Sequence, residues 1–152
     1  MKWSVSTCFF LGASEKTLQL IKEKARVVYP HITVETYFPP YKPEFSDEDN
    51  RAMIDAVNRV KPDLLWVGMT APKQEKWAYT HYEELDVKGH IGTIGAVFDF
   101  FAGTVERAPE AWQKRGMEWA YRLLKEPRRM WRRYLLGNLI FFRHMIREKF
   151  GE

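Results

Sequence analysis

Residues 63–77 read Asp-Leu-Leu-Trp-Val-Gly-Met-Thr-Ala-Pro-Lys-Gln-Glu-Lys-Trp, and this stretch decides the fold class. Its first part, residues 63–69, has the continuous apolar character of a buried strand. The part that follows the turn predicts a helix over residues 74–85. A strand that leads through a short polar turn into a helix is typical of α/β proteins with a parallel sheet.

The turn itself, from Thr70 to Lys73, is a candidate binding site. Turns of this kind bind anionic ligands, because backbone N–H groups at the start of the helix lack partners within it. Lys73 and Gln74 add side-chain donors. The alternative is an ordinary strand-to-helix loop in which Pro72 marks the start of the helix.

The same alternation of strand and helix extends in both directions from this stretch. Ser14 is expected to cap one helix, and Ser46 with Asp49 three residues later is expected to cap another. We therefore predict an α/β fold, a parallel sheet with helices on both faces and right-handed crossovers. Ligands of such sheets bind beyond the carboxyl ends of the strands. The expected strands are 4–11, 32–38, 63–69 and 90–94, and their carboxyl ends lead into 12–14, 38–41, 70–74 and 95–99.

Two glycines and one aspartate follow predicted strands. Gly12 and Gly95 permit either close approach of a ligand or a sharp turn, and neither belongs to a G-x-G-x-x-G dinucleotide fingerprint. Asp99 lies between two phenylalanines. It is either a polar group directed into the site or a local cap, and the sequence leaves both open.

The charge of the chain is unevenly distributed. Residues 1–113 carry 13 Lys/Arg and 16 Asp/Glu, whereas residues 114–152 carry 11 and 4. We expect an α/β core over residues 1–107 and a helical, basic appendage over residues 108–152 that meets an anionic partner. Helices are predicted over residues 109–115, 117–126, 127–136 and 139–150 of the appendage. The last of them is amphipathic, which suits either an anionic membrane surface or packing on the sheet domain or a partner subunit. The apolar stripe of this helix is Leu139, Phe142, Met145 and Ile146.

Several classes of chemistry have no signature here. The single cysteine, Cys8, and four scattered histidines give no metal-ligand spacing, and neither a P-loop nor a nucleophile elbow is present. No recognised nucleic-acid motif accompanies the basic appendage, so we expect no nucleic-acid partner. No apolar run approaches the roughly 18 to 20 residues that span a bilayer, and cysteine usage favours a reducing cytoplasm.

Three ordered motifs carry a family resemblance. The first is Pro62 to Trp77, and the second is Ile94 to Gly103 followed by Arg107-Ala108-Pro109. The third runs from Gly116 through Arg128-Arg129 to Leu135. Together they resemble the WecG/TagA/CpsF family of bacterial glycosyltransferases over roughly residues 5 to 140.

The resemblance implies a Rossmann-like core with a C-terminal appendage that reaches the membrane and helps complete the site. It implies transfer of an N-acetylmannosamine-type sugar from a UDP donor to a polyprenyl-diphosphate-linked N-acetylglucosamine, in synthesis of teichoic acid, common antigen or capsule. The implied location is the cytoplasm, at the inner face of the plasma membrane. No metal or cofactor is implied, because arginine side chains can stabilise the leaving diphosphate.

The resemblance also assigns site residues. Gln74 is implied to lie in the donor and acceptor pocket, and the appendage arginines, of which we favour three, to face the UDP diphosphate. The turn and strand-end residues are then expected to be substrate-binding, and Gln74 is expected to be catalytic as well. Asp99 is our own candidate for a replacement general base, since the resemblance places the family's base in another region. The substrate-binding set is Gly12, Thr70, Lys73, Gln74, Gly95, Arg122, Arg129 and Arg132.

A further N-terminal region, which carries the aspartate thought to act as general base, is implied as well. This sequence shows no counterpart of that region, and Asp63 is expected at the opposite end of the sheet. We therefore expect a fragment, a truncated form or a natural half that needs a partner. The alternative function is a catalytically silent module that binds UDP-sugar or membrane. An exposed sheet edge would favour self-association into a homo-oligomer.

Overall fold

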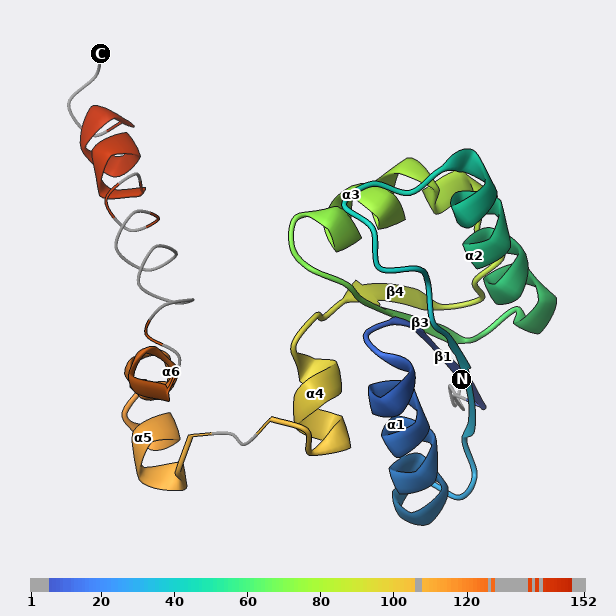
Figure 1. Cartoon of the computed structure of the whole chain (residues 1–152), viewed down its shortest axis with the longest axis horizontal. Coiled ribbons are helices and arrows are strands. Elements are labelled where there is room, and N and C mark those ends of the chain that lie inside the picture. The colour runs from blue at the N-terminus through green and yellow to red at the C-terminus, as the bar shows by residue number, and fades with distance from the viewer. Residues whose placement is uncertain are drawn as a thin grey trace. The chain divides into compact units, whose positions relative to one another are not determined.

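The computed structural model describes residues 6–105, 108–125, 127, 137, 139 and 141–148. The chain divides into two compact units, Met1–Glu106 and Arg107–Glu152. The first unit contains the sheet and the second contains helices (Figure 1).

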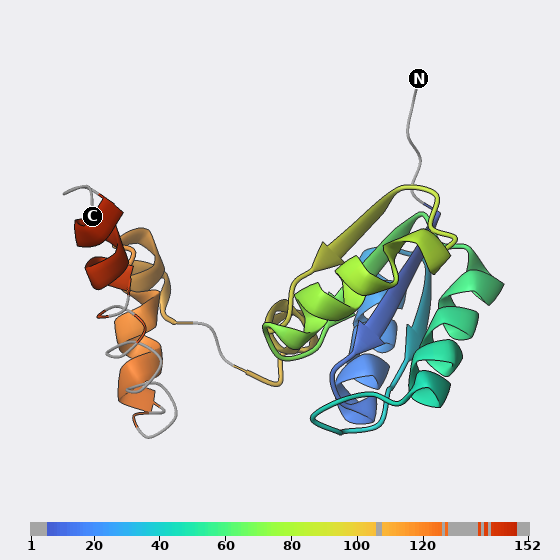
Figure 2. The ribbon, with the colours of Figure 1, turned by 90° about the horizontal axis from the view of Figure 1, so that it is seen from above.

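The first unit is built on a parallel sheet of four strands with helices packed on it. This arrangement confirms the predicted α/β, Rossmann-like fold class. Figure 2 shows the strands running in the same direction. Their order across the sheet is β2-β1-β3-β4, so the chain builds outward from β1 to β2 and then returns to build β3 and β4 on the other side. The order reverses between β1 and β3, where doubly wound sheets bind their ligands. The strands are β1 (Thr7–Gly12), β2 (Thr33–Tyr37), β3 (Leu64–Gly68) and β4 (His90–Thr93).

Helices cover both faces of this sheet, as the alternation predicts. In Figure 1, α1 (Glu15–Val28) and α4 (Val97–Ala102) lie on one side of the strands, and α2 (Asp47–Val60) and α3 (Lys73–Thr80) lie on the other.

Each face of the sheet has its own apolar core. Successive side chains of a strand point to opposite faces, so β1 contributes to both cores: Phe9 and Leu11 pack with α2 and α3, and Phe10 packs against Leu18, Ile21 and Phe98.

The predicted helix caps are confirmed. The Ser14 hydroxyl accepts a hydrogen bond from the Thr17 backbone N–H at 3.1 Å and begins α1. Ser46 and Asp49 form a capping box at the start of α2, in which each side chain accepts from the backbone N–H of the other residue. Both helices therefore begin where the sequence places them.

Two helical segments differ from the prediction. The helix predicted over 74–85 is shorter: α3 ends at Thr80 and a 3₁₀ turn, η1 (Tyr82–Glu84), follows. The Asn58 side chain of α2 explains the early end, because it donates to the Glu84 carbonyl at 2.8 Å and accepts from the Asp86 N–H at 2.7 Å. The second difference is α4, where the sequence suggests only the end of a strand.

The second unit contains α5 (Glu110–Lys114), α6 (Glu118–Lys125) and a helical stretch over residues 141–148. The predicted helices over 109–115 and 117–126 are thereby confirmed. An edge-to-face contact between the rings of Trp112 and Tyr121, with centroids 6.0 Å apart, packs α5 against α6. Of the helix predicted over 127–136, all but residue 127 lies outside the described residues. Among the described helices, none is long and apolar enough to cross a membrane.

Candidate functional site

The ends of β1 and β3 meet at the point where the strand order reverses. The Ala13 N–H donates to the Gly68 carbonyl at 2.7 Å. Gly12 has a φ of +123°, and a Cβ at this position would overlap the same carbonyl. The close approach that the sequence allows for at Gly12 is therefore made by the backbone of β3, and only glycine permits it.

Gly68 has a second close neighbour, the ring of Phe98 in α4. A Cβ on Gly68 would lie 2.6 Å from that ring. Phe98 itself is only 1% exposed. Phe98 also contacts Phe10 of β1 edge-to-face, with the ring centroids 5.2 Å apart. Neither Gly68 nor Phe98 is a candidate site residue from the sequence alone. The signal that could have found Gly68 is a glycine that ends an otherwise apolar strand.

Gln74 is the polar residue that the structure places most firmly at this edge. Its side chain is 5% exposed, although it belongs to the first turn of α3. The amide oxygen accepts from the Met69 N–H at 3.2 Å, and the amide nitrogen donates to the Glu75 carboxylate at 2.7 Å. The turn before it is closed by the Thr70 carbonyl, which accepts from the Lys73 and Gln74 backbone N–H groups. The Gln74 amide is therefore held in one orientation.

Gly95, in the turn after β4, lies against this amide. Its φ is +44°, and a Cβ would be 3.2 Å from the Gln74 side-chain oxygen and 3.5 Å from the Met69 carbonyl. The structure thus brings Gln74, Gly95 and the end of β3 together. Thr70 is exposed beside them. A buried, fixed amide next to an exposed turn at the carboxyl edge is an arrangement suited to orienting a polar ligand.

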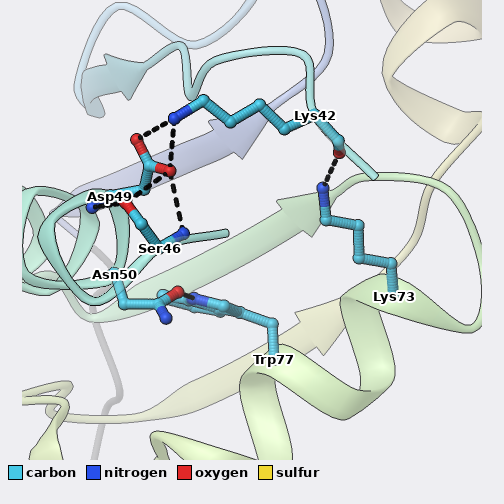
Figure 3. Close-up of polar contacts among 6 residues, drawn as sticks. All are labelled: Lys42, Ser46, Asp49, Asn50, Lys73 and Trp77. Carbon is cyan, nitrogen blue, oxygen red and sulfur yellow. Dashed lines mark hydrogen bonds and ion pairs between the residues drawn. The ribbon is translucent and has the colours of Figure 1, made fainter. Parts of the chain in front are cut away.

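Lys73 extends in a different direction from Gln74. Its Nζ donates to the Lys42 carbonyl in the loop between β2 and α2 (Figure 3). The same Nζ lies over the ring of Phe45, 3.4 Å from the ring centroid. Burial lowers the pKa of Lys73, and the charge of Asp49 acts in the opposite sense. Lys73 therefore joins α3 to a neighbouring loop.

Asp99 lies in α4, where its backbone caps the helix end locally and its carboxylate contacts two hydroxyl groups. Its backbone carbonyl accepts from the Gly103 and Thr104 N–H groups at 2.9 and 3.0 Å, which ends the helix. Its carboxylate accepts from the hydroxyls of Thr104 at 3.2 Å and Thr17 at 3.5 Å. Since Thr17 belongs to the first turn of α1, the carboxylate lies beside the carboxyl end of β1.

Asp63 lies just before β3, at the opposite edge of the sheet from this site, as the sequence predicts. Its carboxylate accepts from the Ser6 N–H, the Ser6 hydroxyl and the Thr7 N–H at 2.8 to 2.9 Å. These hydrogen bonds, the one from the Ser6 backbone first, lower the pKa of Asp63. Its contacts join the start of β3 to β1, which is a structural role.

Three arginines of the appendage are predicted to face the diphosphate. Arg122 belongs to α6, but its side chain is outside the described residues, as are Arg129 and Arg132. Their predicted role toward a diphosphate stays a prediction. Within the described part of the chain, no three His, Cys, Asp or Glu side chains gather in a way that could hold a metal ion.

Comparison with known proteins agrees with the motifs. The model of the glycosyl transferase WecG/TagA/CpsF family matches residues 2–152. The N-acetylglucosaminyldiphosphoundecaprenol N-acetyl-beta-D-mannosaminyltransferase of Staphylococcus aureus strain MW2 is 30% identical over 124 residues, which cover 82% of this chain and 46% of the relative. The protein of the same name from strain MRSA252 is 31% identical over the same shares.

This chain spans about half the length of the curated relatives it matches. The family match, by contrast, covers nearly the whole of this chain. It includes the strand and turn that hold Gln74, the glycine turn after β4 and the basic C-terminal segment. The resemblance drawn from the three motifs is thereby confirmed, and the chain belongs to the WecG/TagA/CpsF family of glycosyl transferases.

Proposed function

We propose that this chain acts as a glycosyltransferase that moves an N-acetylmannosamine-type sugar from a UDP donor to a polyprenyl-diphosphate-linked N-acetylglucosamine. The family is one of glycosyl transferases, and the names of the two Staphylococcus aureus relatives specify this sugar and an undecaprenyl-diphosphate acceptor. Such a reaction would serve the synthesis of a bacterial cell-surface polysaccharide.

One observation carries the proposal. The Gln74 side chain is buried and fixed by hydrogen bonds from Met69 and to Glu75, at the carboxyl edge of a parallel sheet and against the turn at Gly95. That edge is where doubly wound folds bind nucleotides and related ligands. An amide held in place before the substrate arrives can orient the transferred sugar without further loss of side-chain entropy.

The leaving group sets the second requirement. Breaking the bond between sugar and UDP develops negative charge on the diphosphate, which planar guanidinium groups stabilise well. We assign this role to Arg122, Arg129 and Arg132 of the basic C-terminal segment. On this proposal transfer needs no metal ion, so it should persist when a chelator is added.

A base must accept the proton of the attacking hydroxyl. Asp99 is the candidate within this chain, because its carboxylate lies beside the first turn of α1, at the same edge of the sheet as Gln74. Its two hydroxyl contacts, from Thr17 and Thr104, would hold the carboxylate in position without removing its charge.

A transfer assay tests the proposal. The full chain is incubated with UDP-N-acetylmannosamine and polyprenyl-diphosphate N-acetylglucosamine, alone and together with the part of a Staphylococcus aureus relative that this chain does not cover, and UDP release is followed. We expect release that depends on the acceptor and persists in chelator. Gln74→Ala should lower the rate by about 10- to 100-fold, as expected for loss of an orienting group.

Gln19→Ala is the matched control, since Gln19 is exposed on α1 and its amide donates to the exposed Glu23. Its rate should equal that of the unaltered chain. Equal rates for Gln74→Ala would contradict the role of this edge. UDP-sugar binding without turnover in either arrangement would instead identify a catalytically silent binding module.

A further inference from the structure

The loop between β2 and α2, residues 38–46, is attached to the start of α3 by Lys73. The Lys73 ammonium donates to the Lys42 carbonyl and lies over the face of the Phe45 ring, 3.4 Å from its centroid. A lysine cation over an aromatic face is attracted by the ring electrons, and more strongly when partly buried. One side chain therefore contacts the loop at two points.

The loop is also fixed to the helix that follows it. The Lys42 Nζ binds the two carboxylate oxygens of Asp49 at 2.8 and 3.1 Å, and Asp49 accepts from the backbone and hydroxyl of Ser46 (Figure 3). Next to this network, the Trp77 ring nitrogen donates to Asn50 at 3.0 Å. The first turn of α2 is thus a rigid support, and Lys73 connects that support to the candidate site.

Lys73 and Gln74 have complementary positions. Gln74 contacts Met69 and the turn at Gly95, whereas Lys73 contacts the loop on the other side. The first turn of α3 is therefore held from two directions. Lys73 is half-buried in this position, and this burial lowers its pKa. Its cost of burial is offset by the carbonyl and ring contacts to the loop.

We propose that Lys73 is a positioning residue for sugar transfer, which holds loop 38–46 in place as one side of the donor site. The loop starts at the carboxyl end of β2 and carries the fully exposed ring of Tyr41. In this role Lys73 acts through the loop and need not touch the reacting atoms. The kinetic part of this inference rests on the proposed function, while the structural part does not.

Hydrogen–deuterium exchange on the full chain tests the structural part. Lys73→Met removes the cation and donor but keeps most of the side-chain length, and Lys73→Arg keeps a cation that can donate and stack. Lys76→Met is the matched control, because Lys76 is exposed on the same helix. The non-proline amides of residues 38–46 should exchange about tenfold faster in Lys73→Met, from loss of a hydrogen bond to a charged group. Lys73→Arg should largely restore the slower rate.

The transfer assay tests the kinetic part. In Lys73→Met the KM for the UDP-sugar should rise about tenfold, in line with the loop-opening equilibrium, while kcat changes less than about twofold. Lys76→Met should change neither constant. Exchange of the β1 and β3 amides should be unaltered in all variants, which shows that the sheet remains folded.

Three results would overturn the inference. Unchanged exchange in residues 38–46 of Lys73→Met would show that Lys73 does not hold the loop. A fall in kcat at constant KM would place Lys73 at the reacting atoms, and an equal effect of Lys76→Met would show a general loss of charge. If the unaltered chain transfers no sugar, the proposed function fails, yet the exchange experiment still decides whether Lys73 fixes the loop.

Discussion

Gly12 shows how a single residue sets the geometry of the site. Its positive φ and the contact with the Gly68 carbonyl both exclude a side chain. We expect Gly12→Ala to lower the free energy of unfolding by about 2 to 4 kcal/mol, since a backbone clash adds to the unfavourable φ. Gly103→Ala separates the two effects, because Gly103 also has a positive φ, while among the described residues, its chain neighbours aside, no atom lies within 4 Å of its Cβ position. Urea unfolding should give a smaller loss there, and equal losses would contradict the account.

Asp63 provides a test in the acid range. Its pKa lies below the ordinary value of 3.8, because the Ser6 and Thr7 donors favour the ionised carboxylate. A depressed pKa means that its contribution to stability is present above about pH 4 and is lost as pH falls further. The urea midpoint of the unaltered protein should therefore fall between about pH 5 and 3.

Asp63→Asn should make that fall shallower. The substitution should not remove the fall in stability, because Asp49 contributes to it as well. Hydrogen bonds from Lys42 and Ser46 hold the pKa of Asp49 at about 2, so protonation of Asp49 also lowers stability as the pH falls. A pH profile that is identical in Asp63→Asn and the unaltered chain would show that the Ser6 contacts contribute nothing.

The sequence identifies Gln74 and Lys73 as polar residues at the start of a helix, but not what each contacts. Adjacent residues of a helix point about 100° apart, so they cannot share one partner. Gln74 forms hydrogen bonds with Met69 and Glu75, which are near it in sequence, but the turn at Gly95 that lies against it is distant. The loop that Lys73 contacts is distant in sequence as well. Only the folded chain brings them together.

At the scale of elements, α2 is the helix that the sequence specifies best. Its capping box is readable as Ser46 followed by Asp49, and both reciprocal hydrogen bonds form. Ser46→Ala should lower the free energy of unfolding by about 1 kcal/mol. Thermal unfolding measures this, and Ser46→Asn should retain most of the stability because asparagine also caps helices. A loss with Asn as large as with Ala would count against capping as the cause.

Two elements differ from the prediction: α4 was not predicted as a helix, and α3 is shorter than predicted. α4 has six residues rich in phenylalanine, which local pattern does not distinguish from the end of a strand. Its helical form follows from the burial of Phe98 against Gly68. α3 ends early because Asn58, far away in sequence, binds the backbone after it. Periodicity within one segment contains none of this information.

At the scale of the whole molecule, the alternation of strands and helices predicts the parallel sheet correctly. The helical C-terminal segment is a separate matter, and we propose that it binds the inner face of the plasma membrane. Residues 141–148 form a helix on which several large apolar side chains are exposed alongside arginines. Apolar contact together with basic charge is the combination that binds anionic lipid surfaces.

Vesicle sedimentation tests this proposal. The full chain should bind phosphatidylglycerol vesicles, and binding should weaken as salt is raised. Phe142→Ser should reduce binding severalfold, since Phe142 is 56% exposed in this helix. Tyr79→Ser is the control, because Tyr79 is an 87% exposed aromatic residue of α3. Equal binding to neutral phosphatidylcholine vesicles, or equal loss in both variants, would contradict the proposal.

The most direct test of the central claim, that the donor binds at the carboxyl edge beside Gln74, is to map UDP-N-acetylmannosamine binding by backbone-amide NMR on the full chain. Shifts should concentrate in residues 12–14, 69–75 and 94–97, and Gln74→Ala should weaken the binding measured by titration. Shifts concentrated at the opposite edge, around Ser6 and Asp63, or no binding at all, would contradict the claim.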